Sequence, residues 1–172
     1  VYLRELEKEN RVEMENIDWS NIGFGYRKTN GNVRCHYKDG AWGAVEVHTD
    51  ENISIHMAAT CLHYGQSAFE GLKAFRGKDG KIRIFRLEAN AERLMSSCDG
   101  ILMPQVSTEL FREMVTKVVE LNKEFVPPYE SGASLYIRPL LIGTSAQVGV
   151  NPSKEYLFVI FVTPVGPYFK KG

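Results

Sequence analysis

Tyr136 and Arg138 form the pair of side chains in this sequence that is best suited to bind a carboxylate. They stand two residues apart in the run LYIRP at 135–139, and residues two apart on a strand point to the same face of a sheet. A guanidinium can donate two parallel hydrogen bonds to a carboxylate, and a phenol beside it can add another. An ordinary surface salt bridge would show the same spacing, so the pattern alone leaves both interpretations open.

A second candidate is the segment LHYGQSAFEG at 62–71. It places the aromatic residues Tyr64 and Phe69 close to His63, Glu70 and two glycines. Polar and aromatic side chains that gather on a connection often line a ligand site. A structural loop with an aromatic plug has the same composition, and composition does not separate the two.

Arg93 and Tyr168 complete the set of candidates. Arg93 lies in a predicted helix beside the apolar Leu94 and Met95. It is either a solvated charge or a clamp for an anionic group. Tyr168 directly follows the turn-like sequence PVGP at 164–167.

Several kinds of site are not expected. The chain has no GxGxxG, Walker A, GxSxG or HExxH motif. Its three cysteines are far apart and include no CxxC pair: Cys35, Cys61 and Cys98. We therefore expect free thiols in the reducing environment of the cytoplasm, no disulfide framework and no metal site.

The elements that must position these candidates begin with short strands. Apolar and polar residues alternate in three segments, at 33–37, 45–47 and 53–57, and Lys38-Asp39-Gly40 predicts a turn after the first. Leu72–Arg76 and Lys81–Arg86 flank the sequence GKDG at 77–80. The Asp-Gly pair tolerates positive φ, so this segment predicts a hairpin.

Two amphipathic helices and two more strands follow. Apolar residues recur at helical spacing over 87–103 and over 110–125, with Ser107 as the expected N-cap of the second helix and Pro127-Pro128 as its end. A strand is expected over Ser134–Ile142, interrupted by Pro139, and another over Tyr156–Val162, whose apolar run predicts burial on both faces. The order predicts an α+β fold, with two principal helices packed on a mainly antiparallel sheet.

Length and charge narrow the class of protein. The 172 residues correspond to one domain. Lys and Arg total 21, as do Asp and Glu, and this zero net charge argues against a nucleic-acid partner. No apolar run approaches about 18 residues, so no membrane span is expected.

Together these segments resemble the branched-chain amino-acid aminotransferases, a group of the fold-type IV enzymes that use pyridoxal phosphate (PLP). The motifs that carry the resemblance lie in family order between about Met14 and Phe169: FG at 24–25, LHYG at 62–65, FEG at 69–71, FR at 85–86, NAERL at 90–94, LYIRP at 135–139 and PVGPYF at 164–169. The HYG and FEG blocks also fit D-amino-acid transaminases and aminodeoxychorismate lyases. The YxRP and PVGxYF blocks narrow the resemblance to the branched-chain group.

The resemblance implies a role for each candidate. Arg93 would contact the phosphate of PLP. The pocket for the substrate side chain would be walled by Tyr64, Phe69 and Tyr136. Arg138 and the Tyr136 hydroxyl would let the same pocket accept glutamate or 2-oxoglutarate, and Tyr168 would close over the substrate. The implied reaction moves the amino group of Leu, Ile or Val to 2-oxoglutarate in a homodimer, whose partner subunit completes part of the pocket.

The resemblance also implies residues that this chain does not contain. In the family the Schiff-base lysine lies beyond the PVGxYF motif, in a larger second domain, and Lys170 and Lys171 match no family motif. We therefore expect a small N-terminal domain at 14–163, an extension at 1–13 and the start of an interdomain linker at 164–172. This chain alone should not transaminate. A free-standing module that binds a carboxylate ligand or a partner, without catalysis, is the alternative from a different class.

Overall fold

The framework of the protein is a twisted sheet in which all strand pairs are antiparallel. The computed structural model describes residues 17–167, so the predicted extension at 1–13 and Tyr168 lie outside the described residues. The main path of the sheet runs β2 (Ala41–Trp42), β1 (Asn32–Lys38), β8 (Tyr156–Val165), β7 (Ser134–Gly143), β5 (Leu72–Arg76) and β6 (Ile82–Ile84). In addition, β3 (Glu46–His48) pairs with β1 and β4 (Ser67–Phe69) pairs with β7.

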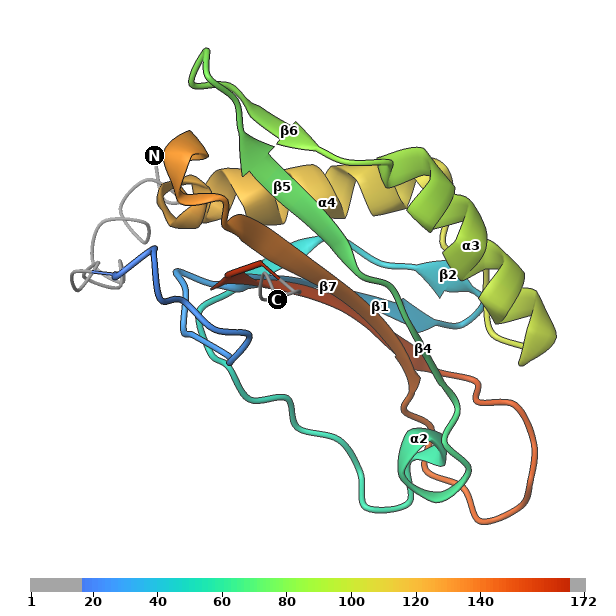
Figure 1. Ribbon diagram of the computed structural model, residues 1–172. Helices are drawn as coiled ribbons and strands as arrows, with labels where there is room; N and C mark the ends of the chain where they lie inside the picture. The colour runs from blue at the N-terminus through green and yellow to red at the C-terminus, as the bar shows by residue number, and fades with distance from the viewer. Residues whose placement is uncertain (1–16, 168–172) are drawn as a thin grey trace, which may run out of the picture.

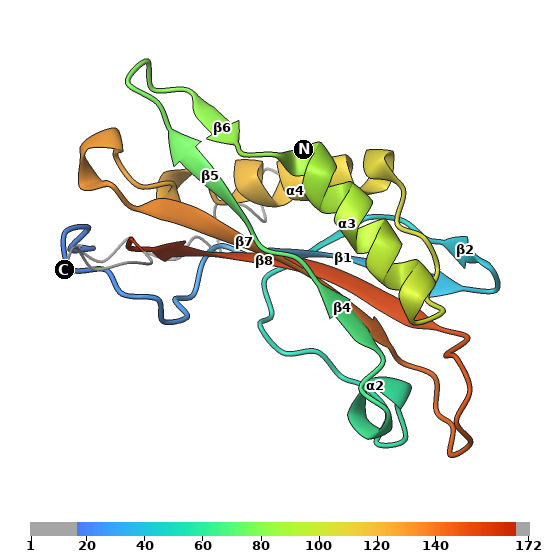
Figure 2. The same ribbon diagram turned by 45° about the vertical axis from the view of Figure 1, so that its right-hand side comes forward.

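Two helices, α3 (Leu87–Gly100) and α4 (Thr108–Leu121), cover one face of this sheet (Figures 1 and 2). Their apolar stripes meet alternate residues of the central strands in one core, where Leu94, Phe111 and Phe158 are fully buried. The rings of Phe111 and Phe158 stack with their centroids 6.3 Å apart. The predicted α+β fold with two principal helices is therefore confirmed. Three single turns complete the elements: α2 (Thr60–His63), η1 (Lys123–Phe125) and η2 (Tyr129–Ser131).

Local side-chain hydrogen bonds fix both ends of α4. The Ser107 side chain accepts a hydrogen bond from the Leu110 amide at 3.2 Å, which confirms the predicted N-cap of α4. This helix ends at Leu121, earlier than its apolar pattern predicted. The buried Asn122 side chain donates to the carbonyl of Val118 at 2.8 Å, and Phe125 reaches the core from the turn η1 instead.

The two predicted turns form hairpins of different geometry. Asp39 and Gly40 both have positive φ, at 52° and 83°, and they join β1 directly to β2. This is the two-residue geometry that matches the twist of a hairpin. The loop between β5 and β6 is longer, and there Gly80 alone has positive φ, at 74°.

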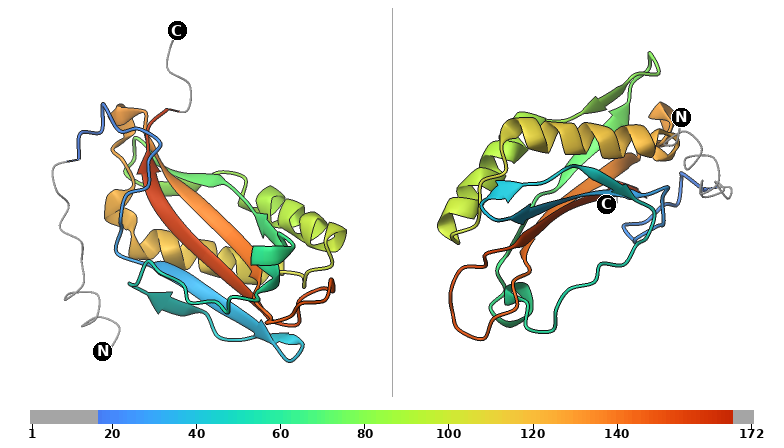
Figure 3. Two further views of the ribbon diagram at one scale, coloured as in Figure 1. Left: turned by 90° about the horizontal axis from the view of Figure 1, so that it is seen from below. Right: turned by 180° about the vertical axis from the view of Figure 1, so that it is seen from behind.

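The prediction of a strand at 53–57 is wrong. Residues 51–56 make no ladder with another strand. Instead, the connection from β3 to α2 passes over the sheet face that α3 and α4 leave uncovered (Figures 1 and 3). Ile55 packs there against the small apolar cluster of Ile142, Leu157 and Val159. The alternating pattern thus reflects an extended segment lying across a sheet, with Met57 largely exposed.

Pro139 does not interrupt β7. It pairs in register with Ile160 of β8, and its carbonyl accepts a hydrogen bond from the Glu70 amide. The side that lacks an N–H therefore faces the junction where β4 ends and β5 begins, so the sheet loses little there. The last strand, β8, extends beyond the predicted Val162 to Val165, and the predicted linker at 164–172 shares its first two residues with it.

The three cysteines are free thiols, as expected, and Cys35 and Cys98 are buried. Burial raises the pKa of the Cys98 thiol to about 11, with a further contribution from the Asp99 carboxylate. Within residues 17–167, the helices are all too short or too polar to cross a membrane.

Candidate functional site

The sheet face opposite α3 and α4, here called the open face, brings the Tyr-Arg pair together with aromatic residues. Tyr136 and Arg138 point to this face because the alternate residues of β7, Leu135 and Ile137, are fully buried in the helix-side core. Phe161 of β8 lies directly opposite Arg138 in the strand register. The open face thus gathers polar and aromatic groups from two long central strands.

The Arg138 guanidinium is held by the side chain two residues before it. Its Nε and Nη2 atoms donate to the Tyr136 hydroxyl at 3.2 and 2.8 Å. Its planar group also lies 4.5 Å from the centre of the Phe69 ring, an attractive arrangement for a cation. No carboxylate of residues 17–167 makes a salt bridge with Arg138, so its remaining donors can serve an anionic ligand.

The segment before β1 adds two aromatic rings to the open face. The Phe24 ring meets Tyr136 edge-on at 5.4 Å, and Tyr26 meets Phe161 edge-on at 6.1 Å. The Arg27 amide donates to the Thr163 hydroxyl at 2.9 Å, which ties this segment to β8. Phe24 and Tyr26 are 49% and 61% exposed, so both rings remain accessible from solvent.

These additional rings carry only a weak sequence signal. Phe24 belongs to the FG motif at 24–25 that this chain shares with the family, but no spacing in the sequence predicted that its ring would contact Tyr136. Phe161 sits in an apolar run that predicted burial on both faces, and it is partly exposed because the open face is uncovered there. Only the strand register reveals that it faces Arg138.

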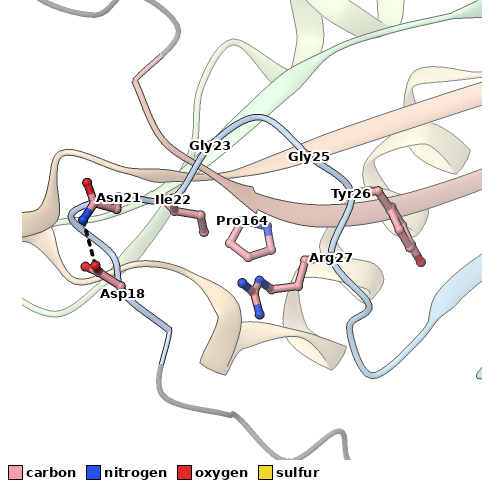
Figure 4. Close-up of a pocket in the computed structure, with 8 residues that line it drawn as sticks. All are labelled: Asp18, Asn21, Ile22, Gly23, Gly25, Tyr26, Arg27 and Pro164. Carbon is pink, nitrogen blue, oxygen red and sulfur yellow. Dashed lines mark hydrogen bonds between the residues drawn. The ribbon is translucent and has the colours of Figure 1, made fainter.

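A cavity of about 380 Å³ lies beside this aromatic group (Figure 4). Its lining comes from the segment before β1 and the end of β8: Asp18, Asn21, Ile22, Gly23, Gly25, Tyr26, Arg27 and Pro164. The Asn21 amide donates to the Asp18 carboxylate at 2.9 Å and lowers the pKa of that carboxyl group. No local pattern in the sequence predicts this cavity, because its walls are brought together only by the pairing of distant segments.

Arg93 lies on the helix side and is paired with a buried acid. Its Nε and Nη2 atoms donate to the two oxygens of Glu70 at 2.8 and 2.5 Å, and Nη2 also reaches Asn90 Oδ1 at 3.1 Å. The Glu70 side chain is 3% exposed, whereas that of Arg93 is 67% exposed. The hydrogen bonds and charge of Glu70 raise the pKa of Arg93 above its usual value. Arg93 is therefore a fixed cation with an accessible outer edge.

Tyr64 does not join the group around Arg138 within one chain. It directly follows α2, a turn that lies beyond the end of β7 (Figure 1). Its hydroxyl donates to the carbonyl of Val148 in the loop between β7 and β8. Its side chain is 42% exposed. Of the predicted site residues, the structure brings together Phe69, Tyr136 and Arg138, places Arg93 at the other side of the β4–β5 junction and leaves Tyr64 apart.

The fold first defines a class, the small domain of branched-chain aminotransferases. The solved structure of the branched-chain amino acid aminotransferase of Escherichia coli matches with a TM-score of 0.60 and 26% identity, over 80% of this chain and 42% of that chain. The branched-chain aminotransferase of the thermophilic archaeon Thermoproteus uzoniensis, solved with norvaline, matches with a TM-score of 0.60 and 25% identity, over 80% and 43%.

Sequence comparison then identifies the family. The model of amino-transferase class IV matches residues 67–169, and the chain belongs to that family. The branched-chain-amino-acid aminotransferase of Haemophilus influenzae is 49% identical over 159 residues, which are 92% of this chain and 46% of that protein. The chain thus spans about half the length of the curated relatives it matches.

Proposed function

We propose that this chain is the N-terminal part of a PLP-dependent branched-chain aminotransferase, which transfers the amino group of Leu, Ile or Val to 2-oxoglutarate. The observation that carries the proposal is the convergence of Phe69, Tyr136 and Arg138 on the open face of a class IV aminotransferase domain. The names of the similar proteins favour the branched-chain group over D-amino-acid transaminases, aminodeoxychorismate lyases and a non-catalytic module.

The geometry supports two kinds of substrate in one pocket. Phe69 and Tyr136 offer ring surfaces against which a branched aliphatic side chain can pack. The Arg138 guanidinium and the Tyr136 hydroxyl are hydrogen-bonded to each other and can take the distal carboxylate of 2-oxoglutarate. Tyr168, which lies outside the described residues, would close this pocket.

Arg93 fits one contact to the phosphate of PLP. Its guanidinium is oriented by Glu70 and exposed at its outer edge, as an anion clamp requires. PLP, when bound, supplies the electron sink for removal of the substrate α-proton. We expect the lysine that binds PLP covalently to lie in the second domain of the longer protein. The small domain predicted at 14–163 should be inactive and largely free of PLP when isolated.

We also propose that the active form is a homodimer. The connection around α2 and the loop after β7 expose five apolar or aromatic side chains at one end of the sheet: Met57, Leu62, Tyr64, Val148 and Val150. A patch of this kind is typical of an interface. Burial of this patch against a second copy would let Tyr64 contribute to the partner's pocket.

The free thiols of the three cysteines support a location in the cytoplasm, where thiols are kept reduced.

The proposal is tested with the full-length protein that contains this chain, purified and supplied with PLP. We expect formation of glutamate from leucine and 2-oxoglutarate, and an Arg138→Gln variant whose KM for 2-oxoglutarate is about tenfold to a hundredfold higher, because it loses a charged hydrogen bond. The KM for leucine should change much less. A full-length protein that transaminates D-alanine but not leucine would contradict the proposal.

A further inference from the structure

Glu70 is a buried acid that no proposed chemical step uses. Its side chain is 3% exposed and sits at the junction between β4 and β5. A buried carboxylate is costly unless it is paired and hydrogen-bonded. Both of its oxygens are occupied by Arg93, and its own amide donates to the Pro139 carbonyl at 2.9 Å. The hydrogen bond to Pro139 fixes the Glu70 backbone to the central strand β7, and burial limits the positions that its carboxylate can take.

Some N–H donors of the Arg93 guanidinium are used by Glu70 and Asn90, and the others remain available to a ligand. A guanidinium has five N–H groups. Glu70 takes the Nε donor and one Nη2 donor, and Asn90 takes the other Nη2 donor. Within residues 17–167, no hydrogen bond involves Nη1 of Arg93. The Nη1 edge belongs to a side chain that is 67% exposed, so it can meet a ligand from solvent.

We propose that Glu70 is a positioning residue, which holds the Arg93 guanidinium so that its Nη1 edge is presented to the phosphate of PLP. This inference rests on the proposed function. An unrestrained arginine has many rotamers and must lose that freedom when it binds an anion. Glu70, with Asn90 as a second acceptor, imposes this order before the ligand arrives. Binding of the phosphate then costs less conformational entropy.

The chain offers a matched control for this role. Asp79 and Arg83 form a second bidentate pair, with distances of 2.9 and 2.8 Å, but both side chains are exposed in the β5–β6 hairpin. Asp79→Asn removes the same kind of contact from an arginine that we assign to no ligand. An effect specific to Glu70 cannot then be attributed to the loss of any acidic partner of an arginine.

The test measures the dissociation constant of PLP for the full-length protein by equilibrium dialysis, with kcat at saturating PLP as a second readout. Glu70→Gln should raise the dissociation constant about tenfold, because a neutral amide restrains the guanidinium less well, and kcat should fall by a smaller factor. Asn90→Ala removes one of the three hydrogen bonds of Arg93 and leaves the Glu70 carboxylate paired. This variant should raise the dissociation constant of PLP about threefold. Asp79→Asn should leave it unchanged.

A double variant shows whether Glu70 acts through Arg93. If it does, Glu70→Gln combined with Arg93→Ala binds PLP no more weakly than Arg93→Ala alone. Additive losses would contradict the inference, as would unchanged PLP affinity in folded Glu70→Gln. If that variant does not fold, unchanged affinity in Asn90→Ala contradicts it. A wild-type full-length protein that neither binds PLP nor transaminates would overturn the proposed function and this inference together.

Discussion

Three consecutive residues, Phe69, Glu70 and Gly71, each contact a different candidate side chain. Phe69 points to the open face, where its ring lies under Arg138. Glu70 points to the helix side, where it pairs with Arg93. Gly71 lies against the Tyr136 hydroxyl, with no room for a side chain between them. The alternation of a strand therefore lets one short segment arrange groups on both sides of the sheet.

Gly71 gives a prediction at the residue scale. A Cβ atom added there would come closer than van der Waals contact to the Tyr136 hydroxyl, so Gly71→Ala should displace this ring and break its hydrogen bonds with Arg138. In the full-length protein we expect the KM for 2-oxoglutarate to rise at least about tenfold, in line with loss of a charged hydrogen bond. Gly100→Ala is the control, because a Cβ there meets nothing within 4 Å. Equal kinetics for the two variants would show that the Tyr136 ring tolerates the change.

The Cys98 thiol predicts how stability depends on pH. Its pKa is raised from 9.0 to about 11 by burial in the folded state. Between these values the unfolded chain binds fewer protons than the folded one, so the free energy of unfolding should fall as the pH rises from about 9 to 11. The contribution of this group is about 3 kcal/mol at most. Urea denaturation of the wild type and of Cys98→Ala across this range measures it, and parallel profiles would contradict the assignment.

Among the helices and strands, the sequence predicts the features that depend on residues close together in the chain, such as helix caps and tight turns. The N-cap Ser107 and the Asp39-Gly40 turn each act within a few residues, and both were recognisable in the sequence. The register that sets Phe161 opposite Arg138 depends on two strands distant in the chain, and no local pattern reveals it. The same limit explains the wrong strand at 53–57, because alternation shows that one side is buried but does not show whether a ladder partner exists.

The N-cap Ser107 should make a measurable contribution to the stability of α4. Its side chain satisfies one of the free amides at the start of α4, and Ser107→Ala should lower the free energy of unfolding by about 1 kcal/mol. For a domain of this size, such a change lowers the melting temperature by about 2–4 °C. The matched control is Ser97→Ala at an exposed position in the last turn of α3, where alanine is the better helix former. Calorimetry should show opposite shifts for the two variants.

At the scale of the whole molecule, the two sides of the sheet are completed differently. The helix side forms the closed core, whereas the open face keeps partly exposed rings over β7 and β8. Figures 1 and 3 show that the connection from β3 to α2 covers only part of that face. Spacing within one strand was enough to predict the Tyr136–Arg138 pair, but the pairing of Arg93 with Glu70 required the packing of α3 beside β4.

The exposed patch around α2 leads to a prediction about assembly. Val148 and Val150 are 85% and 79% exposed in a loop held to the α2 turn through Tyr64, so the patch is preorganised to meet a second copy. A Val148→Asp/Val150→Asp variant should shift the full-length protein from dimer to monomer, because charges placed in an apolar interface would be buried unpaired. Phe85→Asp is the control, because Phe85 is 64% exposed and directly follows β6, which lies far from α2 in Figure 1. Sedimentation equilibrium should detect dissociation in the first variant alone. A double variant that remains dimeric would place the interface on another surface.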